Sequence, residues 1–326
     1  MTAISTGKDR VPAKKPVKMT GQLWRTIWSY KYIYLMLLVP MAFFVIFRYI
    51  PMYGLQLAFK QYHLQGMAAS PWIGLANFNR MWVETDFYRS IINTLIVSFL
   101  KIAIGFPFPI LLAIMINEVY MPRYRKFLQT IYTFPHFLSW IIVAGICLNL
   151  FGDSGAIKKI LLSISATREI GSNWNFLYNT GIFRSFLVGT DIWKEAGWGT
   201  IIYLASIAGI DPSLYEAATI DGCNRVQRIW YITIPGIMNM IIIQFLLRVG
   251  GVMDGSFDQI FNLYSAPVYP VADTIDTFIY RITFQRQVAV DFGFSTAVGL
   301  FKNVINFILL ISANQIARAF GNDGIM

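Results

Sequence analysis

Acidic and amide side chains near the carboxyl-terminal third of the chain recur at helical spacing, and such groups can form hydrogen bonds with a polar ligand. Asp254, Asp258 and Asn262 are four residues apart, so in a helix they would share one face. Asn303 and Asn306 are three apart inside an apolar run, where polar groups face an aqueous cavity or another helix. We expect these residues to line a ligand path, although interhelical hydrogen bonds or a solvated loop explain them equally well.

Other kinds of chemistry lack the residues they need. The sequence has no Gly-x-x-x-x-Gly-Lys-Ser/Thr phosphate loop, and Gly7-Lys8-Asp9 is a poor fragment of one, so ATP hydrolysis by this chain is not expected. The histidines, His63 and His136, have no ligand-spaced partners, which predicts no metal site. Two cysteines do not suggest a disulfide framework. Scattered carboxylates argue against a membrane-bound glycosyl or prenyl transferase.

The composition is that of an integral membrane protein. Apolar residues make up 56% and charged residues 13%, against about 45–50% and about 25% in soluble domains. The net charge of +10 could indicate a nucleic-acid partner, but basic residues crowd the first 31 positions. This is the positive-inside pattern, so we expect a cytoplasmic N-terminus and no nucleic acid. The first apolar run lacks a following cleavage site, which favours a retained span over a signal peptide.

Six apolar runs predict an all-α membrane protein with six transmembrane helices, and the first, at about residues 32–50, is long enough to cross about 30 Å of hydrocarbon. The other spans lie at about residues 91–115, 131–151, 236–251 and 294–317, and the fourth span has residues 197–210 as its clean apolar part. The predicted organisation is a basic cytoplasmic segment with an interfacial helix (1–31), a first span with a periplasmic loop (32–88), a transmembrane core (89–317) and a cytoplasmic tail (318–326).

Charged residues interrupt two of these runs. Lys101 lies within the second run. A cation in a span is usually functional or paired, but this lysine could also only pack near the bundle interior, and the sequence does not favour one interpretation over the other. Asp191 and Lys194 precede the apolar part of the fourth run. Because they are three residues apart, they can pair on one helical face.

A polar stretch separates the fourth and fifth runs, and its residues predict two short helices joined by a glycine turn. Asp211 can cap a helix over residues 213–220, and Gly222 suits the left-handed conformation that follows a helix end. Asn224 can cap a second helix, which Pro235 ends or kinks. With a cytoplasmic N-terminus, this stretch lies in the cytoplasm.

The same stretch contains a spaced motif. Its residues are Glu216, Ala217, Ala218, Gly222, Ile232, Ile234 and Pro235. This resembles the EAA loop of bacterial ABC-importer permeases, which has Glu-Ala-Ala, three residues, Gly, nine residues and Ile-x-Leu-Pro; only Ile234, in place of Leu, departs from it.

The resemblance implies roles for these residues. The first short helix would dock in a cleft of an ATPase subunit, with Glu216 supplying a charge and the two alanines allowing close approach. Gly222 would set the angle between the short helices. Ile232, Ile234 and Pro235 would anchor the second helix to the bundle, so that closure of the ATPases moves the spans as rigid bodies.

Two further stretches, residues 51–78 and 193–205, look like the sugar-importer branch, and more narrowly its poly- and oligosaccharide permeases. The resemblance implies a bacterial inner-membrane subunit, with both termini cytoplasmic, that imports an oligosaccharide or polysaccharide fragment, such as an acidic one from alginate or pectin. Trp193 would line the path. The implied partners are a second homologous permease, two ATP-binding cassette subunits that bind ATP and Mg, an extracytoplasmic solute-binding protein and membrane lipid; no cofactor is expected in this chain.

Two other transporter classes are alternatives. An importer of phosphate, amino acids or metals would share the EAA loop, but not the sugar-importer stretches. An ion-driven secondary transporter would have inverted repeats with broken helices in matching halves. No such repeat is visible, and the polar stretch would then have no explanation.

Overall fold

A computed structural model describes residues 26, 28–172, 174, 176–254, 256–285 and 291–319. Every regular element among them is a helix, and an isolated bridge pairs Lys60 with Trp72. The all-α prediction is therefore confirmed. Most of the predicted basic segment at 1–31, which includes the interfacial helix, and nearly all of the tail at 318–326 lie outside the described residues. The chain divides into two compact units, Met1–Leu55 and Gln56–Met326.

The first unit contains the first predicted span. Helix α2 covers Lys31–Phe44, continues as a π-helical turn over Val45–Tyr49, and leads into a 3-10 helix at Ile50–Phe59. Pro40 lies inside α2, and none of the helix's side chains is buried. An uncovered apolar helix of this length needs lipid or another chain around it.

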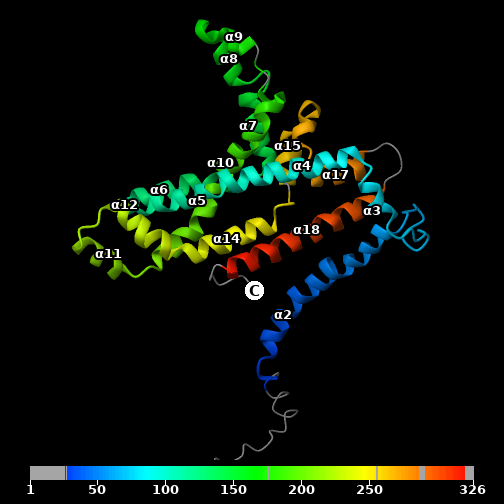
Figure 1. Ribbon diagram of the computed structural model, residues 1–326, viewed down its shortest axis with the longest axis horizontal. Coiled ribbons are helices and arrows are strands. Elements are labelled where there is room, and N and C mark those ends of the chain that lie inside the picture. Colours follow the sequence, from blue (N-terminus) through cyan, green and yellow to red (C-terminus); the bar gives the residue numbers. More distant parts are fainter. Residues whose placement is uncertain are drawn as a thin grey trace, which may run out of the picture. The chain divides into compact units, whose positions relative to one another are not determined.

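The second unit contains the other long helices (Figure 1). They are α4 Thr85–Leu100, a π-helical turn Lys101–Gly105 and α5 Pro107–Asn117 in one run, α7 Trp140–Phe151, α10 Thr180–Ala208, α14 Met238–Gly250 and α18 Phe292–Ala319.

Shorter elements connect them. The α-helices are α3 Ala76–Met81, α6 Pro122–Thr133, α8 Ala156–Ser163, α9 Arg168–Ser172, α11 Pro212–Ile220, α12 Arg225–Arg228, α13 Ile234–Gly236, α15 Phe257–Leu263, α16 Tyr269–Ala272 and α17 Ile275–Tyr280. The 3-10 helices are Phe134–Phe137, Ser165–Thr167, Phe176–Tyr178 and Ala266–Val268, and two more π-helical turns cover Ile229–Thr233 and Arg281–Gln285.

Among the described residues, four helical stretches are long and apolar enough to cross a membrane. They are Lys31–Phe59, Thr85–Asn117, Trp140–Ser163 and Phe292–Ala319. The pair Arg225–Gly236 and Met238–Gly250, bent by 60°, makes a fifth if it forms one span. Helix α10 has the length, with 29 residues, but it carries several charged side chains.

The third span differs from its prediction at residues 131–151, because the helix is interrupted. Helix α6 ends at Thr133, a 3-10 turn follows, and Leu138 and Ser139 are extended before α7 begins at Trp140. Pro135 lacks the N–H that a continuous helix would use, and the Ser139 hydroxyl caps the new helix.

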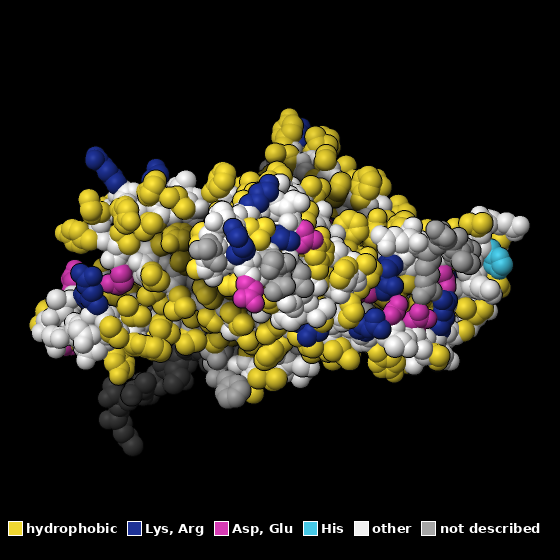
Figure 2. All heavy atoms as spheres, turned by 90° about the horizontal axis from the view of Figure 1, so that it is seen from above, with side chains coloured by type: hydrophobic (Ala, Val, Ile, Leu, Met, Phe, Trp, Pro, Cys, Tyr) yellow, Lys and Arg dark blue, Asp and Glu magenta, His cyan; other side chains and the backbone are white. Residues whose placement is uncertain are grey.

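Two features of the second unit position the candidate site. Helices α14 and α18 lie side by side, and α5 packs along α10. In Figure 1, α6, α11 and α12 lie at one end of these long helices, and α3 and α17 lie towards the other. Hydrophobic side chains cover much of the face shown in Figure 2, as a lipid-embedded bundle requires.

Candidate functional site

The stretch from Asp211 to Gly236, here called the elbow, begins with a capped helix. The Asp211 carboxylate accepts a hydrogen bond from the backbone N–H of Ser213 at 2.9 Å. This hydrogen bond holds the pKa of Asp211 below its usual range. Pro212 occupies the first turn of α11, where its missing N–H costs nothing.

A glycine turn ends α11. Gly222 has a φ of +75°, and its N–H donates to the Thr219 carbonyl at 3.2 Å, while the N–H of Cys223 donates to the Ala218 carbonyl at 2.9 Å. This pair of bonds is a Schellman motif. A Cβ at Gly222 would meet open space, so it is the positive φ, and not a lack of room, that favours glycine there.

The second short helix, α12, is fixed at both ends. Asn224 and Gln227 form a reciprocal capping box. The Tyr215 hydroxyl lies 3.0 Å from that of Thr233, which ties α11 to the turn after α12. The predicted helix, glycine turn and helix are therefore confirmed. Hydrogen bonds between these elements hold the elbow together as a rigid unit.

The elbow presents part of its motif to the surface. Glu216 and Ala217 are exposed, whereas Ala218 is buried at the inner side of α11. Ile234 packs against a core cluster that includes Ile207 and Ile237. Ile232 is half-buried and Pro235 is exposed. Leu214 and Ile220 add exposed apolar surface to α11.

A second group of residues, here called the polar centre, lies between the long helices. It comprises Lys101, Asp191, Arg248, Ser256 and Gln259. The Lys101 ammonium lies 2.9 Å from a carboxylate oxygen of Asp191, and it also donates to the hydroxyl of Ser256 at 2.7 Å and to the side-chain carbonyl of Gln259. Lys101 and Asp191 are buried, so the three donors of this ammonium all have partners inside the protein.

The prediction that Asp191 pairs with Lys194 is wrong. Lys194 instead donates to the His136 carbonyl and to the Glu195 carboxylate, both at 2.9 Å. The break between α6 and α7 leaves that carbonyl free to accept, and Lys101 is the nearer buried partner for Asp191. The sequence left two interpretations of Lys101 open: a functional or paired cation, or a lysine that only packs. The ion pair with Asp191 rules out the second interpretation.

Arg248 was not among the predicted site residues. Its guanidinium lies 3.4 Å from the second carboxylate oxygen of Asp191, and its side chain is 45% exposed. It lines a cavity of about 170 Å³ with Trp198 and Gln244, and a second cavity of about 270 Å³ with Asp254. The only sequence signal for Arg248 was a cation within an apolar helix, because its partner Asp191 is far away in the chain.

The face predicted for Asp254, Asp258 and Asn262 does not form. Helix α14 ends at Gly250 and α15 begins at Phe257, so Asp254 lies in the connection between two helices. Asp258 and Asn262 are one turn apart on α15. The Asn262 amide donates to the Asp258 backbone carbonyl at 2.7 Å. The helical spacing was misleading because glycines interrupt the helix before Asp254.

The other predicted path residues are dispersed. Asn306 accepts from the backbone N–H of Met253 at 2.9 Å, so it holds α18 to the end of the connection after α14. Asn303 is exposed on α18. Trp193 is exposed on α10 and lines an apolar groove with residues of α7.

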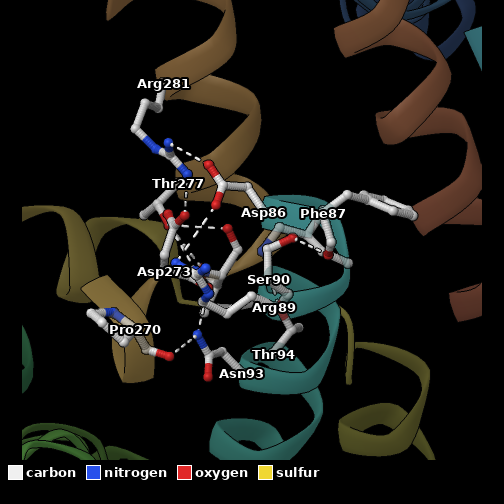
Figure 3. A network of polar contacts seen from close by, with 12 residues as sticks. Asp86, Phe87, Arg89, Ser90, Asn93, Thr94, Pro270, Asp273, Thr277 and Arg281 are labelled. Atoms are coloured by element: carbon white, nitrogen blue, oxygen red, sulfur yellow. Dashed lines mark hydrogen bonds and ion pairs between the residues drawn. The ribbon is translucent and has the colours of Figure 1, made fainter. Parts of the chain in front are cut away.

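A third set of polar contacts lies at the opposite end of the long helices from the elbow (Figure 3). Arg281 pairs with Asp273 and, at 3.2 Å, with Asp86. The Asn93 amide donates to the backbone carbonyls of Pro270 and Asp273. These contacts tie α4 to α16 and α17.

Comparison with known proteins identifies relatives among membrane transport proteins. The family described as "Binding-protein-dependent transport system inner membrane component" matches residues 105–322. The polygalacturonan/rhamnogalacturonan transport system permease protein YteP of Bacillus subtilis (strain 168) is 40% identical over 297 residues, 90% of each chain. Protein LplB of the same organism is 38% identical over 90% of this chain and 91% of its own.

Solved structures agree. A chain of a bacterial ABC transporter involved in the import of the acidic polysaccharide alginate is similar with a TM-score of 0.81 and 40% identity, covering 91% of this chain and 99% of that one. A second structure, a bacterial alginate ABC transporter in complex with alginate pentasaccharide-bound periplasmic protein, gives 0.81 and 38%, over 93% and 100%. The chain therefore belongs to the family of binding-protein-dependent transport system inner membrane components, and it is a multi-pass membrane permease subunit rather than an enzyme.

Proposed function

We propose that this chain is a translocation-pathway subunit of an ATP-driven importer for an acidic oligosaccharide. The observation that carries the proposal is its likeness, over nine-tenths of its length, to a permease for polygalacturonan and rhamnogalacturonan and to a chain of an alginate importer. Pectic and alginate fragments share sugar rings that bear carboxylates. A cargo of this kind needs both hydrogen-bonding groups and a positive charge along its path.

The elbow is the proposed contact with the ATPase. Its first helix is exposed, carries Glu216 beside apolar Leu214 and Ile220, and is held rigidly by caps at both ends. Such a surface suits docking into a complementary cleft, and its rigidity lets movement of a partner be transmitted to α10 and α14. ATP and Mg would be bound by that partner.

Six spans are part of the proposal, with α10 as the fourth. A helix of 29 residues is about 44 Å long, which is enough to cross a bilayer. Its charged Asp191 and Lys194 are buried in ion pairs, so they need not face lipid. The basic helix α6 lies towards the same end as the elbow, and the positive-inside rule then favours cytoplasmic placement of both (Figure 1). Both termini would be cytoplasmic.

The remaining partners follow from this function. We propose a second, homologous permease beside this chain, two ATP-binding cassette subunits below the elbow, and a solute-binding protein on the outer side. The alginate importer's structure contains a periplasmic protein loaded with an alginate pentasaccharide, which supports the last of these.

The test is ATP hydrolysis by the complex that co-purifies with this chain, reconstituted with its binding protein in liposomes. Oligomers of galacturonate or of alginate are expected to stimulate hydrolysis, and neutral maltooligosaccharides are not. Failure to recover any ATPase subunit, or stimulation only by phosphate or an amino acid, would refute the proposal.

The residues predicted to line the path remain a proposal: Trp193, Asp254, Asp258, Asn262, Asn303 and Asn306. Asp258 and Asn303 are the two to test, because both are exposed and neither holds helices together. Replacing each by alanine is expected to reduce uptake at unchanged assembly. Normal uptake by both variants would remove them from the path.

A further inference from the structure

We infer that Arg248 is the residue that binds the carboxylate of the transported sugar, by exchanging its weak contact with Asp191 for one with the substrate. This inference rests on the proposed function, because it assigns the recognition of an acidic cargo to one side chain. Three features of Arg248 support it: its unused hydrogen-bond donors, the charge balance around it and its position between two cavities.

The donors of Arg248 are mostly unused. A guanidinium carries five N–H donors in a planar fork. Within the described part of the chain, the contact found for Arg248 is one hydrogen bond of 3.4 Å to Asp191. Charge-assisted hydrogen bonds are normally about 2.7–2.9 Å long. Because this contact is long and the side chain is 45% exposed, it holds Arg248 weakly.

The local charge favours an anion. Asp191 is already neutralised by the buried ammonium of Lys101 at 2.9 Å, so the group formed by Lys101, Asp191 and Arg248 carries one excess positive charge. The acidic groups that line the two cavities are also ion-paired. In the first cavity, Glu195 binds Lys194 at 2.9 Å. In the second cavity, Asp254 shares the ammonium of Lys302 with Asp276, so the excess positive charge favours an anion on the side of the first cavity.

The two cavities meet at Arg248, which is the one residue that lines both of those described above. The first cavity also offers the exposed indole of Trp198 and the amide of Gln244, and sugars bind to aromatic faces and amides of this kind. The polar centre places these groups around a cation that a sugar carboxylate can reach. The planar fork of arginine matches such a carboxylate through two parallel hydrogen bonds.

The variants Arg248→Gln and Arg248→Lys test this. Glutamine removes the charge, and lysine keeps the charge but not the fork. Arg89→Gln is the matched control, because Arg89 is also 44% exposed and also has one long ion pair, 3.6 Å from Asp86. Each complete importer is reconstituted with its binding protein. ATP hydrolysis is then measured against a galacturonate oligomer and against the same oligomer methyl-esterified at its carboxyls.

Arg248→Gln is expected to raise the half-saturating concentration of the charged oligomer about ten- to hundredfold, as the loss of a charged hydrogen bond does, and to leave that of a transported ester unchanged. Arg248→Lys is expected to have a smaller effect in the same direction, and Arg89→Gln none. If Arg248→Gln does not assemble, the ratio between charged and esterified oligomers in Arg248→Lys gives the answer.

Two results would overturn the inference, and they are distinguishable. If Arg248→Gln, or Arg248→Lys in its place, keeps the wild-type ratio between the charged and esterified oligomers, Arg248 does not bind the carboxylate, while the proposed function stands. If the wild-type importer responds to neither galacturonate nor alginate oligomers, the proposed function fails and the inference fails with it.

Discussion

The ammonium of Lys101 lies 2.9 Å from a carboxylate oxygen of Asp191, although 90 positions separate the two residues in the chain. Lys101 is the first residue of the π-helical turn between α4 and α5, and Asp191 lies within α10. Both side chains are buried. The ion pair therefore joins two long helices at a point where one of them departs from regular α-helical geometry, as functional helices often do.

Removing one partner of this pair should be costly. Lys101→Met leaves the Asp191 carboxylate buried with only the long contact from Arg248, and losing one partner of a buried pair typically costs about 3–5 kcal/mol. We expect a strongly reduced yield of folded protein and a lower thermal unfolding midpoint in detergent. Both are measured by fluorescence-detected size exclusion after heating.

The double variant Lys101→Met with Asp191→Leu is the comparison. It removes both charges, so it should recover a large part of the lost stability. If the single and double variants were equally unstable, the charge pair would not be the cause, and the lysine's packing would be.

Gly222 makes a second prediction, because its φ of +75° strains any residue with a Cβ. Gly222→Val places a β-branched residue in the left-handed region, at a cost of about 1–2 kcal/mol, which changes the angle between α11 and α12. We expect insertion to be normal, whereas uptake and substrate-stimulated ATP hydrolysis are lost. Gly222→Asn should keep most activity, since asparagine tolerates this conformation.

Gly74 supplies the control for this variant. It also has a positive φ, +59°, and a Cβ there would likewise meet open space, but it lies in the loop before α3. Gly74→Val carries the same kind of strain away from the elbow, so its ATP hydrolysis should stay coupled to substrate. Equal loss of coupling in both variants would deny the elbow its role.

The elbow was predictable because its structure depends on neighbours in the sequence. The cap of Asp211 reaches Ser213, and the capping box joins Asn224 to Gln227. The N–H of Gly222 donates to the carbonyl of Thr219 at the end of the helix that Gly222 follows. Interactions over two to five residues follow from residue type and spacing, without knowledge of the tertiary structure.

The polar centre was not predictable for the opposite reason. The charges of Lys101 and Asp191 are visible in the sequence, but their pairing depends on how α10 packs against the run from α4 to α5. The spacing of Asp191 and Lys194 suggested a local pair, and burial against different neighbours overrode it. The prediction for residues 131–151 failed likewise, because hydropathy does not register a break at Pro135 that a tertiary contact accommodates.

The close contact between α10 and the end of α6 gives a third prediction. A Cβ on Gly197 of α10 would lie 1.8 Å from the backbone oxygen of Tyr132, at the end of α6, so only glycine permits this crossing. Gly197→Ala forces the two segments apart, and overpacking of this kind typically costs about 1–3 kcal/mol. We expect a lower thermal unfolding midpoint for the purified complex.

Gly189, two turns earlier on α10, is the matched control. A Cβ there meets nothing within 4 Å, so Gly189→Ala should leave the midpoint unchanged or raise it, because alanine favours the helix by up to about 1 kcal/mol. If Gly197→Ala were as stable as Gly189→Ala, the close approach of α6 to α10 would be wrong.

The carboxyl of Asp273 gives a pH dependence. It is buried between α16 and α17, where it pairs with Arg281 and accepts a hydrogen bond from Thr277 at 2.9 Å. Burial raises the pKa of Asp273 above its ordinary value, and this outweighs the opposite effect of Arg281. The folded protein therefore holds this proton at a pH where the unfolded chain, with a pKa of about 3.9, has released it.

The sign of the effect follows from this difference in proton binding. The stability that the raised pKa contributes is present below about pH 3.9 and is lost as the pH rises through the folded-state value. Asp273→Asn cannot titrate, so its unfolding midpoint should fall less steeply, or rise more steeply, than that of the wild type as the pH is raised through this window. Parallel curves for Asp273→Asn and the wild type would mean that Asp273 has the same pKa folded and unfolded, and that Arg281 fully offsets its burial.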